Sequence, residues 1–401
     1  MSLFGKKQEV SPSLIGVDLG TVGIKVVELL PDKGRLKLAS YGYSELPSGV
    51  MLEKPLIDDP KKAAEVLVRI IKEAGIKAVR ANASLPSNAI FHAIITIPQP
   101  RSAKEDLKPM IEAQVRKLLP RPLEEMILDS TVIDKDLLPK PKVHDKDKKS
   151  KHAVGADPGI GPLAGGTEAT VAADKVDNAE EMSQERKHIR ILISGAPKDL
   201  VAKYIEIFKL AKIELVALET EAFALIRSLI GNDKARIMIV DIGHERTNIS
   251  IVDGGIPFLH RSVKVGGAAV TKVIAKQMNV TDAEAEQMKY DLSVTAESGE
   301  LPPVLKEAMM PIVHEVKYSL DLYGQQMVGG GSVEKIILTG GSASLPQIDR
   351  VLTEALNTNV YIGDPWARLA SYPDLKPVLD EIGPRFAVAV GLAMKLQGEK
   401  K

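Results

Sequence analysis

Two aspartates, each followed two residues later by a glycine, are the first side chains in this sequence that could do chemistry. They stand in the runs Asp18-Leu-Gly20-Thr21 and Asp241-Ile-Gly243-His244. Each run lies between two apolar stretches, which predicts a β-hairpin with the aspartate next to its turn. Glycine lets the backbone approach a phosphate closely, and Mg²⁺ prefers carboxylate and phosphate oxygens. One such aspartate on each of two hairpins predicts a phosphate site with a magnesium ion.

A lysine and a glycine-rich turn add to this prediction. Lys25 follows Asp18 by seven residues and can bring a positive charge to the β- and γ-phosphates. Residues 335–349 contain an apolar run that leads into Gly340-Gly341-Ser342 and then a predicted helix. A glycine-rich turn from strand to helix presents N–H groups to a phosphate or ribose. The turn lacks the Gly-Lys-Ser/Thr of a Walker A loop and the Rossmann glycine spacing.

The elements that must position these residues form a repeat. Aligning Asp18 with Asp241 superposes VDLGTVGIKVVEL on VDIGHERTNISIV. Residues 14–30 and 236–253 each predict a hairpin, and more strands and helices follow both. The simplest architecture is a duplicated α/β domain with a cleft between its halves.

Hydrophobic periodicity predicts the remaining elements. Further strands are predicted over 36–46, 80–97, 189–194 and 213–218. Helices are predicted from Asp59 to Gly75, from Pro197 to Ala211 and from Glu219 to Ile230.

Two more helices are predicted from local signals. Ser102 and Glu105 form a capping box that predicts a helix start, with Pro109 bending the first turns. An apolar helix over 384–397 carries small residues, Gly391 among them, where another helix can approach closely.

Composition excludes several classes of site. The 401 residues are 44% hydrophobic, enough for two domains, and 53 basic residues balance 53 acidic ones, which gives no argument for a nucleic-acid partner. The absence of cysteine excludes disulfides, thiolate zinc sites and iron–sulfur clusters. No apolar run approaches the ~20 residues that span a bilayer, and the start MSLFGKKQEV lacks the apolar stretch of a signal peptide. We therefore expect a cytoplasmic protein that a partner recruits to any membrane it serves.

Residues 138–188 differ in kind from the rest. They contain the basic run PKPKVHDKDKKSKH, then become rich in Gly, Ala and Thr, and hold no aromatic residue. Such a segment buries too little apolar surface to offset its ordering entropy, which predicts a disordered or loosely ordered insertion. Its basic start could touch acidic lipid or a partner, although a solvated loop is the simpler interpretation.

In their order along the chain, these motifs resemble those of the actin-like ATPase superfamily. The two Asp-x-Gly runs are similar to its phosphate motifs, Thr339-Gly-Gly-Ser to its adenosine motif, and the helix near Gly391 to its second connecting motif. The resemblance implies an α/β, ribonuclease H-like fold in which two duplicated domains flank a nucleotide cleft. It also implies ATP and Mg²⁺ as ligands, with Asp18 and Asp241 serving the metal.

The resemblance extends to further nucleotide contacts. Glu286 and Lys289 resemble the superfamily's adenosine-contacting pair, and Gly266-Gly267 its nucleotide-facing glycines. A surface ion pair and an ordinary loop turn are the alternative interpretations. The nucleotide-binding residues implied in this way are Asp18, Gly20, Thr21, Gly23, Lys25, Gly243, His244, Thr247, Gly266, Gly267, Glu286, Lys289, Gly340, Gly341 and Ser342.

Within the superfamily the sequence most resembles the FtsA-related PilM family of type IV pilus assembly. The similar stretches are 15–29, 111–129, 193–225, 240–255 and 335–366, and the Pro-x-Pro-Leu-Glu-Glu run is specific to that family and its relatives. The implied organisation is a flexible tail over 1–12, a first actin-like domain over 13–217, a second over 218–370, and a C-terminal segment over 371–401 that packs back on the first domain. A small extra subdomain of the FtsA and PilM type is expected over about 85–190, with the insertion inside it.

The resemblance implies an ATP-binding scaffold of the pilus inner-membrane assembly platform. The cytoplasmic tail of a PilN-like membrane protein would recruit it to the cytoplasmic face of that membrane, other pilus proteins would contact it, and self-association is left open. The alternative is an FtsA-like division protein that binds ATP and links FtsZ to the membrane, but the end GLAMKLQGEKK lacks FtsA's aromatic-rich amphipathic tail. A sugar or acid kinase would need a base and a substrate pocket, for which the sequence offers no further polar residues.

Glu221 is the candidate residue for ATP hydrolysis. Glu221 lies in a Glu-Ala-Phe-Ala run that resembles the first connecting motif, where a polar side chain can orient the attacking water. A carboxylate favoured by a helix N-terminus explains Glu221 equally well. His244 and His260 have no cluster of metal ligands around them in the sequence, so we interpret them as phosphate or packing contacts. Turnover is expected to be slow if it occurs.

Overall fold

The computed structural model describes residues 13–21, 23–44, 55–100, 102, 105–134, 188–295, 301–326, 332–370 and 373–395. The tail predicted over 1–12 and, apart from His188, the insertion predicted over 138–188 lie outside the described residues. The chain divides into two compact units. The larger comprises Met1–Ala93, Leu119–Asp129 and Ser194–Lys401, and the smaller comprises Ile94–Leu118 and Ser130–Ile193.

The first sheet of the larger unit contains the first Asp-x-Gly hairpin. Its strands are β1 (Leu14–Leu19), β2 (Ile24–Asp32), β3 (Arg35–Tyr43), β4 (Arg80–Leu85) and β8 (Glu214–Thr220), in the order β3-β2-β1-β4-β8. The β1–β2–β3 part is antiparallel, and β4 and β8 continue the sheet in parallel from β1. Successive residues of a strand point to opposite faces of the sheet, and Val26 and Val27 of β2 do so. Val26 packs with the helices on one face, and Val27 packs with the C-terminal helix on the other.

Two helices cover one face of this sheet. They are α1 (Pro60–Glu73) and α3 (Lys198–Leu210), and their apolar residues form one core with β1, β2 and β4. The predicted start of α1 is confirmed, since the side chain of Asp59 accepts a hydrogen bond from the Lys62 N–H at 3.1 Å.

The second sheet repeats the topology of the first, as the sequence repeat predicts. Its strands are β9 (Ile237–Ile242), β10 (Thr247–Asp253), β11 (Ile256–Val263), β12 (Lys335–Thr339) and β13 (Asn359–Ile362), in the order β11-β10-β9-β12-β13. Again three antiparallel strands are extended in parallel by two more. Its core includes residues of α5 (Gly267–Met278), α6 (Asp282–Thr295), α7 (Pro303–Gln326) and α8 (Ile348–Leu356).

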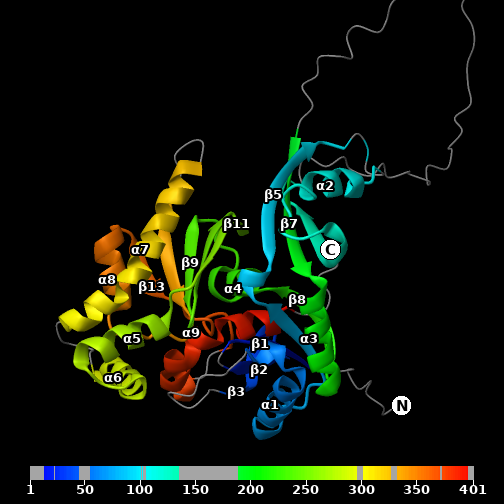
Figure 1. Ribbon diagram of the computed structural model, residues 1–401. Helices are drawn as coiled ribbons and strands as arrows, with labels where there is room; N and C mark the ends of the chain where they lie inside the picture. The colour runs from blue at the N-terminus through cyan, green and yellow to red at the C-terminus, as the bar shows by residue number, and fades with distance from the viewer. Residues whose placement is uncertain are drawn as a thin grey trace, which may run out of the picture. The chain divides into compact units, whose positions relative to one another are not determined.

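Helix α9 (Lys376–Ala393) lies between the two sheets (Figure 1). Leu379 and Phe386 pack with β2 and β3 of the first sheet, while Val388 and Leu392 pack with β9 and β12 of the second. A Cβ added to Gly391 would overlap the carbonyl oxygen of Ala224, so only glycine permits this approach. The small-residue helix is therefore the joint between the halves.

The predicted start of this helix is wrong. The helix begins at Lys376, eight residues before Pro384, which lies inside it. Proline is tolerated best in a first turn, where no N–H is needed, and Pro377 occupies that place. The carbonyl of Pro384 accepts hydrogen bonds from Gly340 N–H at 3.0 Å and from the Thr339 hydroxyl at 2.9 Å.

Two other helix starts also differ from the prediction. Helix α2 (Lys108–Val115) begins after Leu107, without a side-chain cap, and the Ser102 carbonyl only closes a turn with Glu105 N–H at 3.2 Å. Pro109 therefore occupies the first turn and does not bend the helix. Helix α4 (Glu221–Leu225) begins two residues late, because Glu219 and Thr220 complete β8. A π-helical turn, Ile226–Ile230, follows α4.

A three-stranded sheet has the order β5-β7-β6. Its strands are β5 (Phe91–Pro98), β6 (Met126–Val132) and β7 (His188–Pro197).

Among the helices of the described ranges, none has the length and apolar character needed to cross a bilayer.

Candidate functional site

The first hairpin holds Asp18 beside a cation. Asp18 lies opposite Lys25 in the β1–β2 register, and the lysine Nζ is 3.5 Å from its Oδ2. The buried Ser84 hydroxyl, from β4, donates to Oδ1 at 3.2 Å. Gly20 N–H closes the turn on the Gly23 carbonyl at 2.9 Å. A Cβ on Gly20 would lie 3.1 Å from the Lys25 Nζ, so glycine leaves room for the lysine head group.

The second hairpin has the same turn. Gly243 N–H donates to the Arg246 carbonyl at 2.9 Å, and Asp241 lies opposite Asn248, where the first hairpin has its lysine. Gly340 adjoins the aspartate, since a Cβ there would overlap Asp241 Oδ1, and its φ of +90° suits glycine. The predicted glycine-rich turn therefore meets the second Asp-x-Gly run.

Hydrogen bonds to one backbone carbonyl bring three of the glycine motifs together. The Gly243 carbonyl accepts from Gly267 N–H at 3.0 Å and from the Ser342 hydroxyl at 3.2 Å. A Cβ on Gly266 would lie 2.6 Å from the same carbonyl oxygen. Gly341 has no heavy atom within 4 Å of an added Cβ. The second hairpin turn, the glycine pair and the turn after β12 thus form one continuous backbone surface.

Three carboxylates interact electrostatically in this region. Burial and the charges of Asp241 and Asp18 together raise the pKa of Glu221 to about 8, although hydrogen bonds from Ser87 oppose this. Burial and Asp18 raise the pKa of Asp241 to about 6, although Lys25 and a hydrogen bond from Asn248 oppose this. Glu221 is therefore mostly protonated at neutral pH, while Asp241 is mostly ionised. A divalent cation would relieve the repulsion between these groups.

A hydrogen-bonded chain orients Glu221. Its Oε2 accepts from Ser87 N–H at 3.0 Å and from Asn248 Nδ2 at 3.2 Å. The Ser262 hydroxyl donates to Asn248 Oδ1 at 2.7 Å, and Arg246 Nε donates to Ser262 at 3.0 Å. Asn248 and Ser87 were not predicted as site residues. The signal for Asn248 was its alignment with Lys25 in the repeat.

Glu219, two residues before Glu221, has a different role. Arg227 binds its two carboxylate oxygens at 2.8 and 3.0 Å, and Lys395 binds Oε2 at 2.9 Å. Arg227 also donates to the Gly391 carbonyl at 2.5 Å, and Asn82 donates to the Leu392 and Lys395 carbonyls at 3.1 Å each. Arg227 and Asn82 therefore donate hydrogen bonds to carbonyls at the C-terminal end of α9. Glu219 in turn fixes the positions of Arg227 and Lys395.

The Glu286–Lys289 pair is not an isolated surface ion pair. Lys289 is buried, and its Nζ lies 2.7 Å from Glu286 Oε2, 3.0 Å from the Thr271 hydroxyl and 3.4 Å from the Gly267 carbonyl. Burial disfavours the ionised Glu286, but the charge and hydrogen bond of Lys289 outweigh it and lower its pKa. The pair therefore adjoins the Gly266-Gly267 turn. Thr271 was missed, although it follows Gly267 by one helical turn.

Thr247, Thr21 and His244 are three further residues that the sequence predicted for this site. Thr247 is buried and its hydroxyl donates to the Val265 carbonyl at 2.7 Å, so it fixes the hairpin backbone. Thr21 is exposed, and the His244 carbonyl accepts the Ala268 N–H at 2.8 Å. The described residues contain no group of three or more His, Asp or Glu side chains placed to hold a metal ion. Asp18 and Asp241 fit Mg²⁺ only as a partial set, which phosphate and water oxygens would complete, as is usual for this ion.

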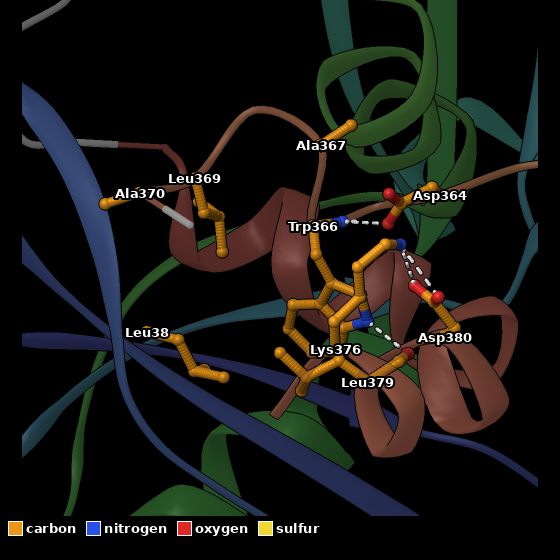
Figure 2. Close-up of a pocket in the computed structure, with 9 residues that line it drawn as sticks. All are labelled: Leu38, Asp364, Trp366, Ala367, Leu369, Ala370, Lys376, Leu379 and Asp380. Carbon is orange, nitrogen blue, oxygen red and sulfur yellow. Dashed lines mark hydrogen bonds and ion pairs between the residues drawn. The ribbon is translucent and has the colours of Figure 1, made fainter. Parts of the chain in front are cut away.

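A pocket of about 220 Å³ lies elsewhere in the larger unit (Figure 2). Leu38 of β3, the 364–370 loop and the first turns of α9 line it, and none of the predicted site residues does. Its polar groups are paired: Lys376 binds Asp380 at 2.7 Å, and Trp366 Nε1 donates to the Leu379 carbonyl at 2.7 Å. The pocket is therefore a feature of α9 packing, separate from the carboxylate site.

Comparisons with known proteins bear on the family and the fold of this chain. The chain matches the family described as type IV pilus assembly protein PilM over residues 16–145 and 175–397. It is 21% identical to the cell division protein FtsA of Bacillus subtilis (strain 168) over 218 residues, 47% of this chain and 49% of FtsA, so the match spans about half of that relative. Among solved structures it resembles the PilM-PilN type IV pilus biogenesis complex, with a TM-score of 0.70, 22% identity, and coverage of 95% of this chain and 98% of that one. At this identity the similarity shows a shared fold.

Proposed function

Because the chain belongs to the PilM family of type IV pilus assembly proteins and has an actin-like ATPase fold, we propose that it is an ATP-binding scaffold of the pilus assembly platform. The observation that carries the nucleotide part is the convergence of two hairpin aspartates. Asp18 and Asp241 interact electrostatically, and Lys25 and the Gly340 turn adjoin them. This combination suits Mg²⁺ and the phosphates of a nucleotide.

The residues divide the nucleotide between them in this proposal. The turns at Gly20 and Gly243 face the phosphates, with Lys25 beside the β- and γ-phosphates. Gly267, Glu286 and Lys289 form the adenosine side. Mg²⁺, when bound, would neutralise charge on the phosphates, and this chain supplies Asp18 and Asp241 to hold it. Glu221 would hold a proton near the carboxylate pair and orient water, which supports slow turnover, because a protonated carboxyl is a poor general base.

Mg·ATP titration by calorimetry tests the nucleotide site. Asp18→Asn and Asp241→Asn keep the side-chain shape and should each weaken Mg·ATP binding at least tenfold, about 1.4 kcal/mol. Asp321→Asn, on an exposed position of α7, is the matched control and should bind as the wild type does. With Mg²⁺ chelated, both site variants should bind ATP at least as well as the wild type, because each removes a negative charge. Unchanged Mg·ATP affinity in both variants would exclude the site.

Steady-state phosphate release tests the scaffold role. A rate faster than about 1 s⁻¹, within the range of ordinary enzymes, would contradict it.

The partner is proposed to be the cytoplasmic tail of a PilN-like membrane protein, which would hold this chain at the cytoplasmic face of the inner membrane. The similar solved structure is a PilM-PilN complex, which supports this proposal. An extended tail can add to the edge of a sheet, and β5 and β6 are the edges of the three-stranded sheet. Residues 85–137, which include both edges, are proposed to contribute to the peptide site. Ile127 of β6 is 46% exposed there.

A synthetic PilN-like tail peptide should bind the full chain with micromolar or tighter affinity, about 8 kcal/mol. Ile127→Asp should weaken this binding, whereas Ile205→Asp, on an exposed position of α3, should not. The FtsA match keeps one alternative, a division protein that binds FtsZ. If an FtsZ tail peptide binds and the PilN-like peptide does not, the division function replaces the pilus function.

A further inference from the structure

Two histidines outside the proposed nucleotide site lie in edge-on ring contact in the larger unit. His92 is the second residue of β5 and His260 lies in β11, and their ring centroids are 5.7 Å apart with an interplanar angle of 61°. The two residues are far apart in the sequence. His92 belongs to the three-stranded sheet and His260 to the second sheet, so the pair joins strands of two different sheets.

A serine holds one nitrogen of each ring. His92 Nδ1 lies 3.2 Å from the Ser194 hydroxyl, and His260 Nδ1 lies 2.9 Å from the Ser250 hydroxyl. Ser250 is directly opposite His260 in the β10–β11 register, so the sheet itself fixes this contact. Metal-binding histidines commonly have such a partner on the nitrogen that does not bind the ion, since it fixes the tautomer and the ring orientation.

The other nitrogen of each ring is buried without a partner. Neither His92 Nε2 nor His260 Nε2 has a hydrogen-bond partner within the described ranges. A buried polar atom without a partner is unfavourable, and native structures contain few of them. Two such atoms on neighbouring rings suggest a shared ligand.

Both rings are in the protonation state that binds a metal ion. Burial lowers the pKa of His92 to about 4, and burial together with the neighbouring His92 lowers that of His260 to about 4. The imidazoles are therefore neutral near pH 7. When a neutral ring donates its Nδ1–H to serine, the lone pair of Nε2 is available.

The ring separation agrees with a single bridging ion. With metal–nitrogen distances of about 2.0–2.1 Å and roughly tetrahedral angles, two imidazoles on one ion place their centroids about 5–6 Å apart. The observed 5.7 Å lies in that range. We propose that His92 and His260 form a two-histidine site for a borderline transition-metal ion of the zinc class, bound through both Nε2 atoms. Imidazole ligands favour zinc, copper and nickel over the magnesium of a carboxylate site.

The site has only two protein ligands within the described residues, where no third His, Asp or Glu joins the pair. Water would complete the coordination shell, so we expect micromolar affinity. The bound ion would hold the start of β5 against β11. Ser87, whose N–H holds Glu221, lies five residues before His92, so the ion would restrain the segment beside the carboxylates.

Zinc titration of the full, nucleotide-free chain by calorimetry tests this site. One Zn²⁺ should bind per chain, and His92→Gln and His260→Gln should each weaken that binding at least tenfold. His314→Gln, at an exposed position of α7, is the matched control and should leave it unchanged. Asp241→Asn should also leave it unchanged, which separates this site from the carboxylates. The proposal would be overturned if Zn²⁺ fails to bind the wild type at millimolar concentration, or if both histidine variants bind Zn²⁺ as tightly as the wild type does.

X-ray absorption of the zinc-loaded wild type provides a second readout that needs no variant. It should show two imidazole nitrogens on the zinc, with oxygen in the remaining positions. A zinc ion with one imidazole or none would overturn the proposal even if both glutamine variants fail to fold.

Discussion

Replacing the ionisable carboxyl group of Glu221 by an amide should stabilise this protein, and the gain should grow with pH. The pKa of Glu221 is raised from 4.5 to about 8, first by burial and then by the charges of Asp241 and Asp18. Between these two pH values the unfolded chain carries the ionised carboxylate and the folded chain carries the protonated form. Unfolding therefore releases a proton, and the free energy of unfolding falls as the pH rises from 4.5 to 8.

The magnitude follows from the two pKa values. Linkage predicts that titration of Glu221 destabilises the fold by about 2 kcal/mol at pH 6 and about 4 kcal/mol at pH 8. Glu221→Gln removes this term, and the glutamine oxygen can still accept from Ser87 N–H and Asn248. The variant should therefore be more stable than the wild type, with a difference that grows by about 2 kcal/mol from pH 6 to pH 8.

Urea denaturation of both proteins at pH 6 and pH 8 measures this difference. Glu219→Gln is the matched control, because that carboxylate is held by Arg227 and Lys395 and its neutralisation should destabilise the fold at both pH values. If the difference between Glu221→Gln and the wild type is the same at the two pH values, Glu221 is not held protonated in the folded state. Loss of ATP turnover in the more stable variant would show that this residue trades stability for function.

Three further predictions test the packing and the histidine pair. Lowering the pH from 7.5 to 5 should lower the free energy of unfolding of the wild type by about 2 kcal/mol for each of His92 and His260, because both are buried with a pKa near 4. The double variant His92→Gln/His260→Gln should lose this part of the pH dependence, which urea denaturation at the two pH values measures. Gly391→Ala should lower the free energy of unfolding by about 3 kcal/mol or more, because the added Cβ would overlap the backbone carbonyl of Ala224. Gly324→Ala in α7 is the control: its added Cβ would have no heavy atom within 4 Å, so the variant should be as stable as the wild type or more stable in thermal unfolding. Replacing residues 138–187 by a short Gly/Ser linker should change the melting temperature little, because loop-closure entropy varies slowly with length, and a fall above roughly 8 °C would show that the segment packs.

The carboxylate site accounts for the difference between two neighbouring glutamates. In the sequence, Glu219 and Glu221 both lie in the first turn of the helix predicted from Glu219 to Ile230, and only the family resemblance favoured the second. In the structure, Glu219 ends β8 and binds two cations, whereas Glu221 begins α4 and has two neutral donors. Removing a buried carboxylate that has cationic partners leaves those cations unpaired and destabilises the fold, while a carboxyl group beside other carboxylates stores unfavourable energy that a ligand can release.

The sequence by itself determined the repeated hairpins and the motifs they carry. An Asp-x-Gly turn between apolar runs is a local signal, and period-two alternation in the flanking strands leaves one register that buries their apolar residues. The pairings of Asp18 with Lys25 and of Asp241 with Asn248 follow from that register. The duplication could be read from the alignment of the two hairpins alone.

Only the tertiary structure decided how distant groups meet. The start of α9 depends on packing against both sheets, which outweighed the local signal of Pro384. Thr247 resembles a ligand in the sequence but donates its hydroxyl to a backbone carbonyl, and the protonation of Glu221 depends on the charges of Asp18 and Asp241. His92 and His260 carry no signal in the sequence, because a histidine pair becomes a site only when two strands from different sheets place the rings within 6 Å. Burial, charge proximity and ring separation are properties of contacts between remote segments, and no local pattern of residues encodes them.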